Sequence, residues 1–326
     1  MIKVGVFFGG KSAEHEISIM SAQNVYDAID KNKFSPKLIK IDKSGFWQIN
    51  EVFEFDVIFP ILHGPFGEDG TIQGLLKLAD IPFVGPGVLG SAVGMDKDVM
   101  KRLLRDAGVP IGKFLSFKDY ENVPSFKEIE NILGSPFFVK PANMGSSVGI
   151  SKVHDEAGLS AALKEAFLYD TKVIIEEYIP GREIECAVLG NEEPIASLPG
   201  EIITAHEFYS YDAKYIDEKG AALEIPAKLD SMTAKHIQEI AVKVFQVLCC
   251  EGLSRVDFFL KESADKNSRY EIIVNEINTI PGFTRISMYP KMWEASGVSY
   301  TELITRLIEL AISRFEKESK LKTSVV

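Results

Sequence analysis

The chain has 326 residues, of which 46% are hydrophobic and 25% are charged, and its formal net charge is −11 at pH 7. This length allows two or three domains, and the composition is that of an ordinary globular protein. The acidic balance argues against a general binder of nucleic acid or of anionic membranes, so any phosphate site must depend on locally placed cations.

The first section of the chain alternates strands and helices. Apolar runs predict strands at residues 2–8, 36–42 and 56–61, helices at about 17–29 and 71–79, and a short extended segment at 83–84. This alternation predicts an open α/β sheet with helices on its faces, which we assign to an N-terminal domain of residues 1–95. The loops at Gly9-Gly10 and His63–Gly67 follow strands, where ligands gather in such sheets.

The middle section predicts a small α+β unit with a mainly antiparallel sheet. An amphipathic helix comes first, and strands and helices then alternate, with helices at about 96–107, 125–133 and 156–168 and strands at 114–117, 137–140, 148–153 and 173–177. We assign this central subdomain to residues 96–180.

The last section mixes strands, one long loop and two long helices. Strands are predicted at 183–189 and 194–197, a tyrosine-containing loop at 204–224, and helices at about 232–250 and 301–317. We assign the C-terminal subdomain to residues 181–318, with 204–224 as a lid, and expect 319–326 to be a frayed tail.

A hairpin before the last helix carries the most informative side chains. Arg255 and Asp257 lie two residues apart on one strand, and Glu276 and Asn278 two apart on the next, so each pair shares a face. The polar stretch between the strands is typical of a hairpin connection. Paired strands would gather oxygen ligands without His or Cys, which suits a hard cation such as Mg²⁺. The alternative is an ordinary solvated hairpin face.

The motifs for phosphate binding are not the common ones. No P-loop is present, and the dinucleotide-like run Gly85–Gly90 contains Pro86 and follows only a short strand, so we interpret it as a turn that caps a helix. Lys140 ends an apolar strand and precedes a loop, Gly145–Gly149, whose small residues would let backbone N–H groups approach phosphate oxygens. A hairpin loop with an exposed lysine is the alternative.

The cysteines and apolar runs indicate a cytoplasmic protein. Cys186, Cys249 and Cys250 have neither the spacing of metal ligands nor that of a disulfide framework, and we expect them to be core residues in a reducing compartment. The initial apolar stretch is too short for a signal peptide, and no run approaches the length of a membrane span.

Taken in order, these motifs resemble those of the ATP-grasp superfamily and, within it, the D-alanine–D-alanine ligase family, from residue 1 to about residue 315. The segments that carry the resemblance are Gly9–Ser18, His63–Gly70, Met95–Lys97, Val139–Pro141, Gly145–Gly149, Tyr211–Tyr215, Arg255–Asp257, Asn275–Thr279 and Pro281-Gly282. It implies an N-terminal α/β open-sheet domain followed by a two-part α+β ATP-grasp fold, with the nucleotide between two sheets. The implied activity is ATP-dependent ligation of two D-alanine molecules for peptidoglycan synthesis.

The resemblance also implies roles for the matched residues in binding ATP and metal. Phosphate contacts fall to Lys97, Lys140, Ser146, Ser147 and Lys214, and the adenine and ribose pocket to Glu176, Glu177, Ile179 and Glu183. Two Mg²⁺ or Mn²⁺ ions would be held by Asp257, Glu276 and Asn278, with Glu276 bridging.

Substrate roles follow in the same way. Glu14 and His63 would bind the first D-alanine, Arg255 and Gly282 would stabilise the tetrahedral intermediate, and Ser287 and Met288 would lie at the second D-alanine. Tyr215 in the lid would reach Glu14 and Ser146. The family further implies a homodimer formed through the N-terminal region, with neither nucleic-acid nor membrane partners.

Three other functions stay open at this stage. The chain is alternatively another ATP-grasp carboxylate–amine ligase, including a D-alanine–D-lactate type, although Tyr215 favours the dipeptide product. A nicotinamide oxidoreductase that uses Gly85–Gly90 and a non-catalytic nucleotide-binding regulator are the remaining alternatives.

Overall fold

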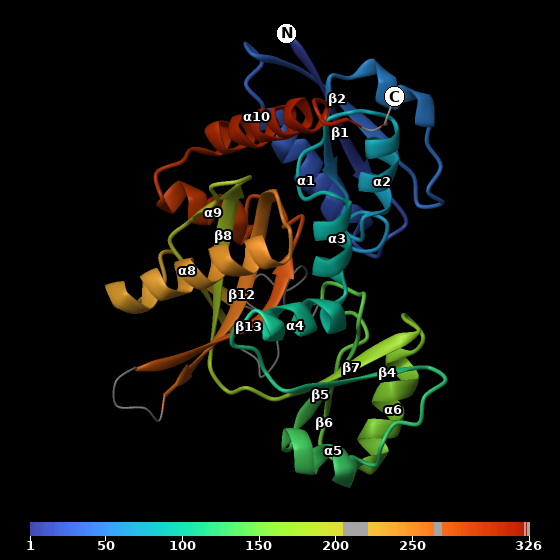
Figure 1. Cartoon of the computed structure of the whole chain (residues 1–326), viewed down its shortest axis with the longest axis vertical. Helices are drawn as coiled ribbons and strands as arrows, with labels where there is room; N and C mark the ends of the chain where they lie inside the picture. Colours follow the sequence, from blue (N-terminus) through green and yellow to red (C-terminus); the bar gives the residue numbers. More distant parts are fainter. Residues whose placement is uncertain (205–220, 264–268, 323, 325–326) are drawn as a thin grey trace.

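The computed structural model describes the chain except for residues 205–220, 264–268, 323, 325 and 326. Within the described residues, three sheets follow one another along the chain, each with helices on it (Figure 1). None of the described helices has both the length and the apolar composition needed to cross a membrane.

The first sheet is parallel, with β1 in the middle, and the prediction of an open α/β arrangement is confirmed. Its strands are β1 (Ile2–Gly9), β2 (Phe34–Ile41) and β3 (Val57–Ile61), and its helices include α1 (His15–Ala28) and α2 (Thr71–Leu78). The short 3-10 helix η1 (Ile49–Glu54) was not predicted. Because the strands are parallel, the loops that follow β1 and β3 meet at one edge, where a Cβ on Gly64 would lie 3.1 Å from the Glu14 carboxylate.

Two helices connect this sheet to the next, α3 (Val88–Met95) and α4 (Lys97–Asp106). Gly87 is the N-cap residue of α3, so the interpretation of Gly85–Gly90 as a helix-capping turn is confirmed. Gly90 is needed for close packing, because a Cβ there would lie 2.5 Å from the carbonyl oxygen of Cys249. Asp96 caps α4 by accepting a hydrogen bond from the backbone N–H of Val99 at 3.0 Å.

The second sheet is antiparallel and has the strand order β4-β7-β5-β6. Its elements are β4 (Phe114–Lys118), α5 (Phe126–Leu133), β5 (Phe137–Pro141), β6 (Ser151–Val153), α6 (Glu156–Ala166) and β7 (Lys172–Glu177). The prediction that a strand starts at residue 148 was wrong. The loop extends to Ile150, because Ser146, Ser147 and Gly149 take φ angles of +51°, +61° and +69°, which a strand cannot contain.

The third sheet is six-stranded and antiparallel, with the main order β11-β10-β8-β12-β13 and β9 paired to β8. Its strands are β8 (Arg182–Gly190), β9 (Ile195–Ala196), β10 (Gly200–Thr204), β11 (Ala221–Glu224), β12 (Gly252–Glu262) and β13 (Tyr270–Asn278), and its helices are α8 (Ser231–Val247), α9 (Met288–Ala295) and α10 (Tyr300–Glu318). β10, β11 and α9 were not predicted. The boundaries 204 and 224 proposed for the lid therefore lie inside two strands that pair with each other.

The apolar cores show which elements pack together. α10 packs Leu303, Leu307 and Ile308 into the core that contains Val4 and Phe59 of the first sheet, and Figure 1 shows α10 beside β1 and β2. The second sheet has a core of its own, formed by residues 115–175. α4 places its apolar face in the core of the third sheet. The domain boundaries at residues 95 and 180 stay predictions.

Candidate active site

β12 and β13 bring the four predicted hairpin residues together. Asp257 pairs with Glu276 and Arg255 pairs with Asn278 in the antiparallel register. The register then shifts, so that Phe258 pairs with Val274 and Asn275 is the extra residue of a β-bulge. Bulges redirect side chains and often lie beside active sites. The predicted hairpin is therefore confirmed, while the bulge had no signal in the sequence.

Arg255 is held in place by carboxylates. Its Nε and Nη2 donate to the two Asp257 oxygens at 2.7 and 2.8 Å, and Glu185 lies 2.8 Å from Nε. Burial on its own would lower the pKa of Arg255, but the neighbouring carboxylates Asp257 and Glu185 raise it well above its ordinary value. The guanidinium is therefore a permanent positive charge in the site.

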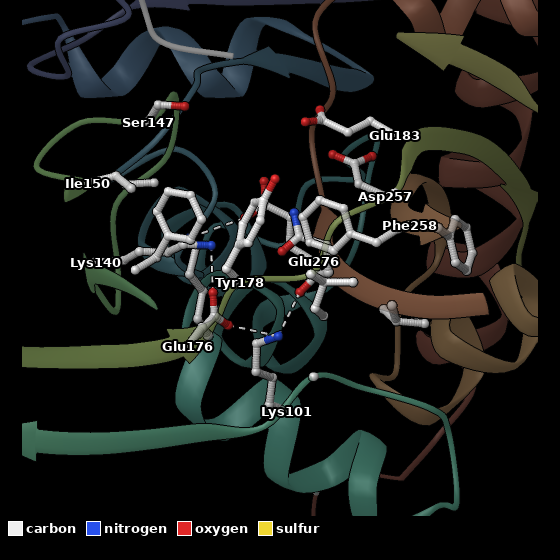
Figure 2. A pocket seen from close by; sticks show the side chains of 18 of the residues that line it. Lys101, Lys140, Ser147, Ile150, Glu176, Tyr178, Glu183, Asp257, Phe258 and Glu276 are labelled. Carbon is white, nitrogen blue, oxygen red and sulfur yellow. Dashed lines mark hydrogen bonds and ion pairs between the residues drawn. The ribbon is translucent and has the colours of Figure 1, made fainter. Parts of the chain in front are cut away.

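A cavity of about 320 Å³ lies between the second and third sheets. Figure 2 shows lysines and carboxylates from β5, β7, β12 and β13 around it. The residues predicted for ATP and metal that line it are Lys97, Lys140, Ser146, Ser147, Glu176, Glu177, Ile179, Glu183, Asp257 and Glu276. Its size is that of a small-molecule site. Glu185, Tyr178 and Lys101 also line the cavity and were not predicted.

Glu176 is shared by two lysines at the floor of this cavity. Its carboxylate lies 2.5 Å from Lys140 Nζ and 2.8 Å from Lys101 Nζ, and Lys101 also donates to the Asn275 carbonyl at 3.1 Å (Figure 2). Burial would raise the pKa of Glu176, but the two lysines outweigh it and lower the pKa to about 2. The shared carboxylate therefore fixes the positions of both ammonium groups at the cavity.

The Gly145–Gly149 loop reaches back to the first sheet. Ser146 Oγ donates a hydrogen bond to the Glu14 carboxylate, so two members of the predicted Glu14–Ser146–Tyr215 set are in contact. Lys97 Nζ donates to the Met144 carbonyl at 2.7 Å and lies 3.5 Å from the Glu276 carboxylate. Tyr215 and Lys214 lie outside the described residues, so their predicted contacts are not seen here.

His63 joins the first and third sheets. Its Nδ1 lies 3.1 Å from the Ile280 carbonyl and its Nε2 lies 3.4 Å from Ser21 Oγ. Burial lowers the pKa of His63, although the nearby Glu14 carboxylate opposes this shift. His63 is therefore expected to be neutral at pH 7, with hydrogen-bonding capacity but no charge.

Glu68 is a further polar residue at this junction that had been assigned no role. It accepts hydrogen bonds from the backbone N–H of Gly64 at 2.7 Å and of Ile280 at 3.0 Å. Burial and the Glu14 charge raise the pKa of Glu68 to about 8. The signal was its place in the His63–Gly70 motif.

The predicted residues for the second substrate lie in the turn after β13. Gly282 packs so closely that a Cβ would lie 2.9 Å from Ser287 Oγ, which itself accepts a hydrogen bond from the Thr284 N–H at 2.9 Å. Met288 is buried at the start of α9. Gly282 and Ser287 are thus neighbours, as their predicted roles require.

The set Asp257, Glu276 and Asn278 suits a hard cation by donor type, since it offers two carboxylates and one amide oxygen. Both carboxylates are charge-balanced by protein cations, namely Arg255 and Lys97. In the part of the chain that the structure describes, no group of three or more His, Cys, Asp or Glu side chains is placed to hold a metal ion.

A cleft with lysines and carboxylates between two antiparallel sheets, with a glycine-serine loop lining it, defines the ATP-grasp class of proteins. The comparisons with known proteins make this more specific. Residues 103–309 match the family described as "D-ala D-ala ligase C-terminus", and residues 3–54 and 48–86 match "D-ala D-ala ligase N-terminus". The chain belongs to the D-alanine–D-alanine ligase family.

Curated relatives match over nearly the whole chain. A D-alanine–D-alanine ligase of Oceanobacillus iheyensis is 50% identical, with 99% of this chain and 98% of the relative covered. D-alanine–D-alanine ligase A of Escherichia coli (strain K12) is 48% identical, with 99% of both chains covered.

Solved structures of D-alanine ligases also resemble this chain over nearly its whole length. The D-alanine–D-alanine ligase of Coxiella burnetii has a TM-score of 0.85 at 38% identity, and covers 98% of both chains. The VanG D-Ala:D-Ser ligase of Enterococcus faecalis has a TM-score of 0.84 at 39% identity, with 95% of this chain and 99% of that one covered. The Bacillus anthracis ligase complexed with ATP has a TM-score of 0.81 at 29% identity, with 98% and 100% covered.

Proposed function

We propose that this protein is an ATP-dependent ligase that joins two D-alanine molecules into D-alanyl-D-alanine for peptidoglycan synthesis. The observation that carries the proposal is the constellation around the cleft. The β12–β13 carboxylates, the buried lysines and the Ser146–Glu14 contact come from distant parts of the chain and meet at one cavity. Full-length relatives about 50% identical, named D-alanine–D-alanine ligase, support the same function.

ATP binds between the second and third sheets in this proposal. The polyphosphate lies near Lys97, Lys140 and the Gly145–Gly149 loop, and the adenosine end lies near Glu177, Ile179 and Glu183. The buried lysines Lys101 and Lys140, both fixed by Glu176, support the phosphate position, because hydrogen bonds from ammonium groups to phosphate are strong. Glu176 itself is engaged by two lysines, so its contribution to the nucleotide is to orient Lys140.

The chemistry follows from the weakness of a carboxylate as an electrophile. Transfer of the γ-phosphoryl group of ATP to the carboxylate of the first D-alanine forms an acyl phosphate and ADP. The free amine of the second D-alanine then attacks the acyl carbon, and phosphate leaves. Fixed positive charges and positioning account for most of the catalysis in phosphoryl transfer.

Asp257, Glu276 and Asn278 are the residues that would hold two Mg²⁺ or Mn²⁺ ions. When bound, such ions supply positive charge to the phosphate oxygens. The chain's own contribution is to fix the two carboxylates in register on paired strands and to offer Asn278 beside them.

The amino acids are assigned to the junction of the first and third sheets. Glu14 takes the ammonium of the first D-alanine and neutral His63 lies near its carboxylate. Arg255 and the Gly282 N–H stabilise the oxyanion of the tetrahedral intermediate, as backbone and guanidinium donors do in acyl transfer. Ser287 and Met288 bind the second D-alanine.

The remaining assignments concern the lid and the assembly. The predicted lid, residues 204–224 with Lys214 and Tyr215, would exclude water, because an acyl phosphate would otherwise hydrolyse; its residues 205–220 lie outside the described residues. The protein acts in the cytoplasm as a homodimer formed through the N-terminal region.

Phosphate release from ATP tests this function. We expect release to depend on D-alanine, with L-alanine and D-lactate giving little stimulation at neutral pH. Absence of stimulation by D-alanine would reject the proposal.

The same assay must also include D-serine as an alternative acceptor amino acid. The likeness to the VanG D-Ala:D-Ser ligase is close to that to the Coxiella burnetii enzyme, with TM-scores of 0.84 and 0.85, so overall similarity to these two structures leaves the acceptor open. Dipeptide product with D-alanine alone would support the proposal, and faster turnover with D-serine as acceptor would favour the alternative. The oxidoreductase alternative is not supported, because Gly85–Gly90 caps α3 instead of opening a dinucleotide-binding βαβ unit.

A further inference from the structure

Lys172 connects two parts of the molecule that have separate cores. It begins β7, in the second sheet, whose apolar core consists of residues 115–175. The helix α4 packs Met100 and Leu104 into the core of the third sheet instead. Among the described residues, no apolar core contains side chains of both β7 and α4, so polar contacts such as the Lys101–Glu176 pair join these two elements.

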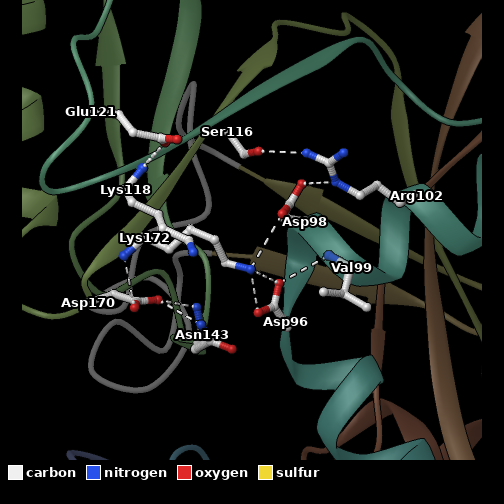
Figure 3. A network of polar contacts seen from close by, with 10 residues as sticks. All are labelled: Asp96, Asp98, Val99, Arg102, Ser116, Lys118, Glu121, Asn143, Asp170 and Lys172. Carbon is white, nitrogen blue, oxygen red and sulfur yellow. Dashed lines mark hydrogen bonds and ion pairs between the residues drawn. The ribbon is translucent and has the colours of Figure 1, made fainter.

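The side chain of Lys172 binds the start of α4. Its Nζ lies 2.7 and 2.6 Å from the two oxygens of Asp96 and 3.4 Å from Asp98 (Figure 3). Only 16% of the Lys172 side chain is exposed, against 18% for Asp96 and 10% for Asp98. Solvent therefore screens these ion pairs much less than it screens a surface pair. Asp96 is also the N-cap residue of α4, so Lys172 holds the residue that fixes where the helix begins.

The side chain of Asp170, next to Lys172, binds the start of the Gly145–Gly149 loop segment on the second-sheet side of the cleft. Asp170, two residues earlier, accepts hydrogen bonds from the Lys172 N–H at 3.1 Å and from both the N–H and the amide group of Asn143 at 2.7 and 2.9 Å (Figure 3). Asn143 precedes the Gly145–Gly149 loop by two residues. The same short segment thus anchors the start of that loop.

Backbone hydrogen bonds also connect Lys172 to Lys97 through Ala142. The Ala142 N–H donates to the Lys172 carbonyl at 2.9 Å, and the Lys97 N–H donates to the Ala142 carbonyl at 3.0 Å. Lys97 then donates from Nζ to Met144 at 2.7 Å. Residues 170–172 therefore contact both Lys97, through Ala142, and the start of the loop, through Asn143. The proposed function assigns Lys97 and this loop to the phosphates.

We infer that Lys172 is a positioning residue for the polyphosphate of ATP, acting through Asp96 and Asp170 on Lys97 and on the Gly145–Gly149 loop. This inference rests on the proposed function. Its electrostatic part concerns Asp96 and Asp98, which flank Lys97: Lys172 pairs with both, and Asp98 is also paired with Arg102 at 2.7 Å. Loss of the Lys172 charge would leave the partly buried Asp96 carboxylate without that cation, next to Lys97 in the chain.

The inference predicts an effect on one end of the nucleotide only. Glu177, at the adenosine end, lies at the other end of β7, and five residues of strand span roughly 17 Å. A change at Lys172 should therefore weaken binding of the β- and γ-phosphates and leave the adenosine contacts unchanged.

The experiment compares Lys172→Met with Lys172→Arg in the full chain with Mg²⁺, using isothermal titration calorimetry. Lys172→Met should raise the Kd of a non-hydrolysable ATP analogue at least tenfold and change the Kd of AMP less than twofold. Lys172→Arg keeps the charge and should restore the analogue's Kd to within about threefold. Lys127→Met, which removes an exposed pair with Glu130 on the same unit, is the control and should change neither constant.

Equal changes for the analogue and AMP, or no change for the analogue, would overturn the inference. If Lys172→Met does not fold, Asp170→Asn provides the second test, because it loosens Asn143 and leaves the Lys172–Asp96 pair in place; the same selective loss is expected. An unsubstituted chain that binds no ATP analogue would overturn the proposed function and this inference together. Normal binding by the chain with unchanged binding by Lys172→Met overturns the inference alone.

Discussion

Replacement of Glu176 by Gln tests the electrostatics of the cavity floor. The pKa of Glu176 is lowered from 4.5 to about 2, because Lys101 and Lys140 outweigh the effect of burial. At roughly 1.4 kcal/mol per pKa unit, this corresponds to about 3 kcal/mol of folding stability. A lowered carboxyl pKa stabilises the fold above pH 4.5, and this contribution disappears as the pH falls from 4.5 towards 2. Removing the carboxylate also leaves two buried lysines without their shared partner, so the total loss at pH 7 should be about 3–5 kcal/mol.

Urea unfolding followed by circular dichroism measures this loss. With a slope of roughly 3 kcal/mol per M, Glu176→Gln should lower the unfolding midpoint by at least about 1 M at pH 7. The difference from the unsubstituted chain should shrink below pH 4.5. Glu130→Gln is the matched control, since its exposed pair with Lys127 contributes less than about 1 kcal/mol. A loss below about 1 kcal/mol for Glu176→Gln at pH 7 would refute the reasoning.

Three further substitutions test other parts of the molecule. Asp257→Asn should lower D-alanine-dependent phosphate release by about 10²–10³-fold with an unchanged circular dichroism spectrum, and near-normal turnover would contradict the metal assignment. Gly90→Ala should cost about 1–3 kcal/mol in urea unfolding, because its Cβ would meet the Cys249 carbonyl at 2.5 Å, whereas Gly74→Ala, with open space around it, should be neutral or stabilising. Glu68 has its pKa raised to about 8, so it binds a proton more tightly in the folded chain, and the stability it contributes falls as pH rises from 4.5 to 8. Glu68→Gln should flatten that fall in a series of urea titrations, and an unchanged pH dependence would argue against the raised pKa.

Much of the site could be predicted because its signals are local. Alternation puts Arg255 with Asp257 on one face of their strand and Glu276 with Asn278 on one face of the next, and the antiparallel register then places Asp257 opposite Glu276. Lys140 follows an apolar run, so a fixed position at a strand end could be predicted before its partner was known.

The rest depends on contacts that span the chain. Lys101 looks like an ordinary lysine on an amphipathic helix, and only its spacing of four residues from Lys97 hints at a shared face. Its burial comes from β7 and from the bulge at Asn275, neither of which has a signal near residue 101. β10 and β11 form because each finds a partner strand, and such pairing is set by tertiary context more than by local propensity.

The position of α10 has a consequence for synthesis. The helix that packs on the first sheet is encoded at residues 300–318, about 240 residues after β3, the last strand of that sheet. At a synthesis rate of roughly 5–20 residues per second, about 10–50 s pass on the ribosome between synthesis of the first sheet and synthesis of α10. We therefore expect a chain that stops at residue 299 to bind a hydrophobic dye such as ANS and to aggregate, and a monodisperse, dye-free truncated chain would contradict this. The first sheet therefore gains its complete apolar core only when α10 emerges.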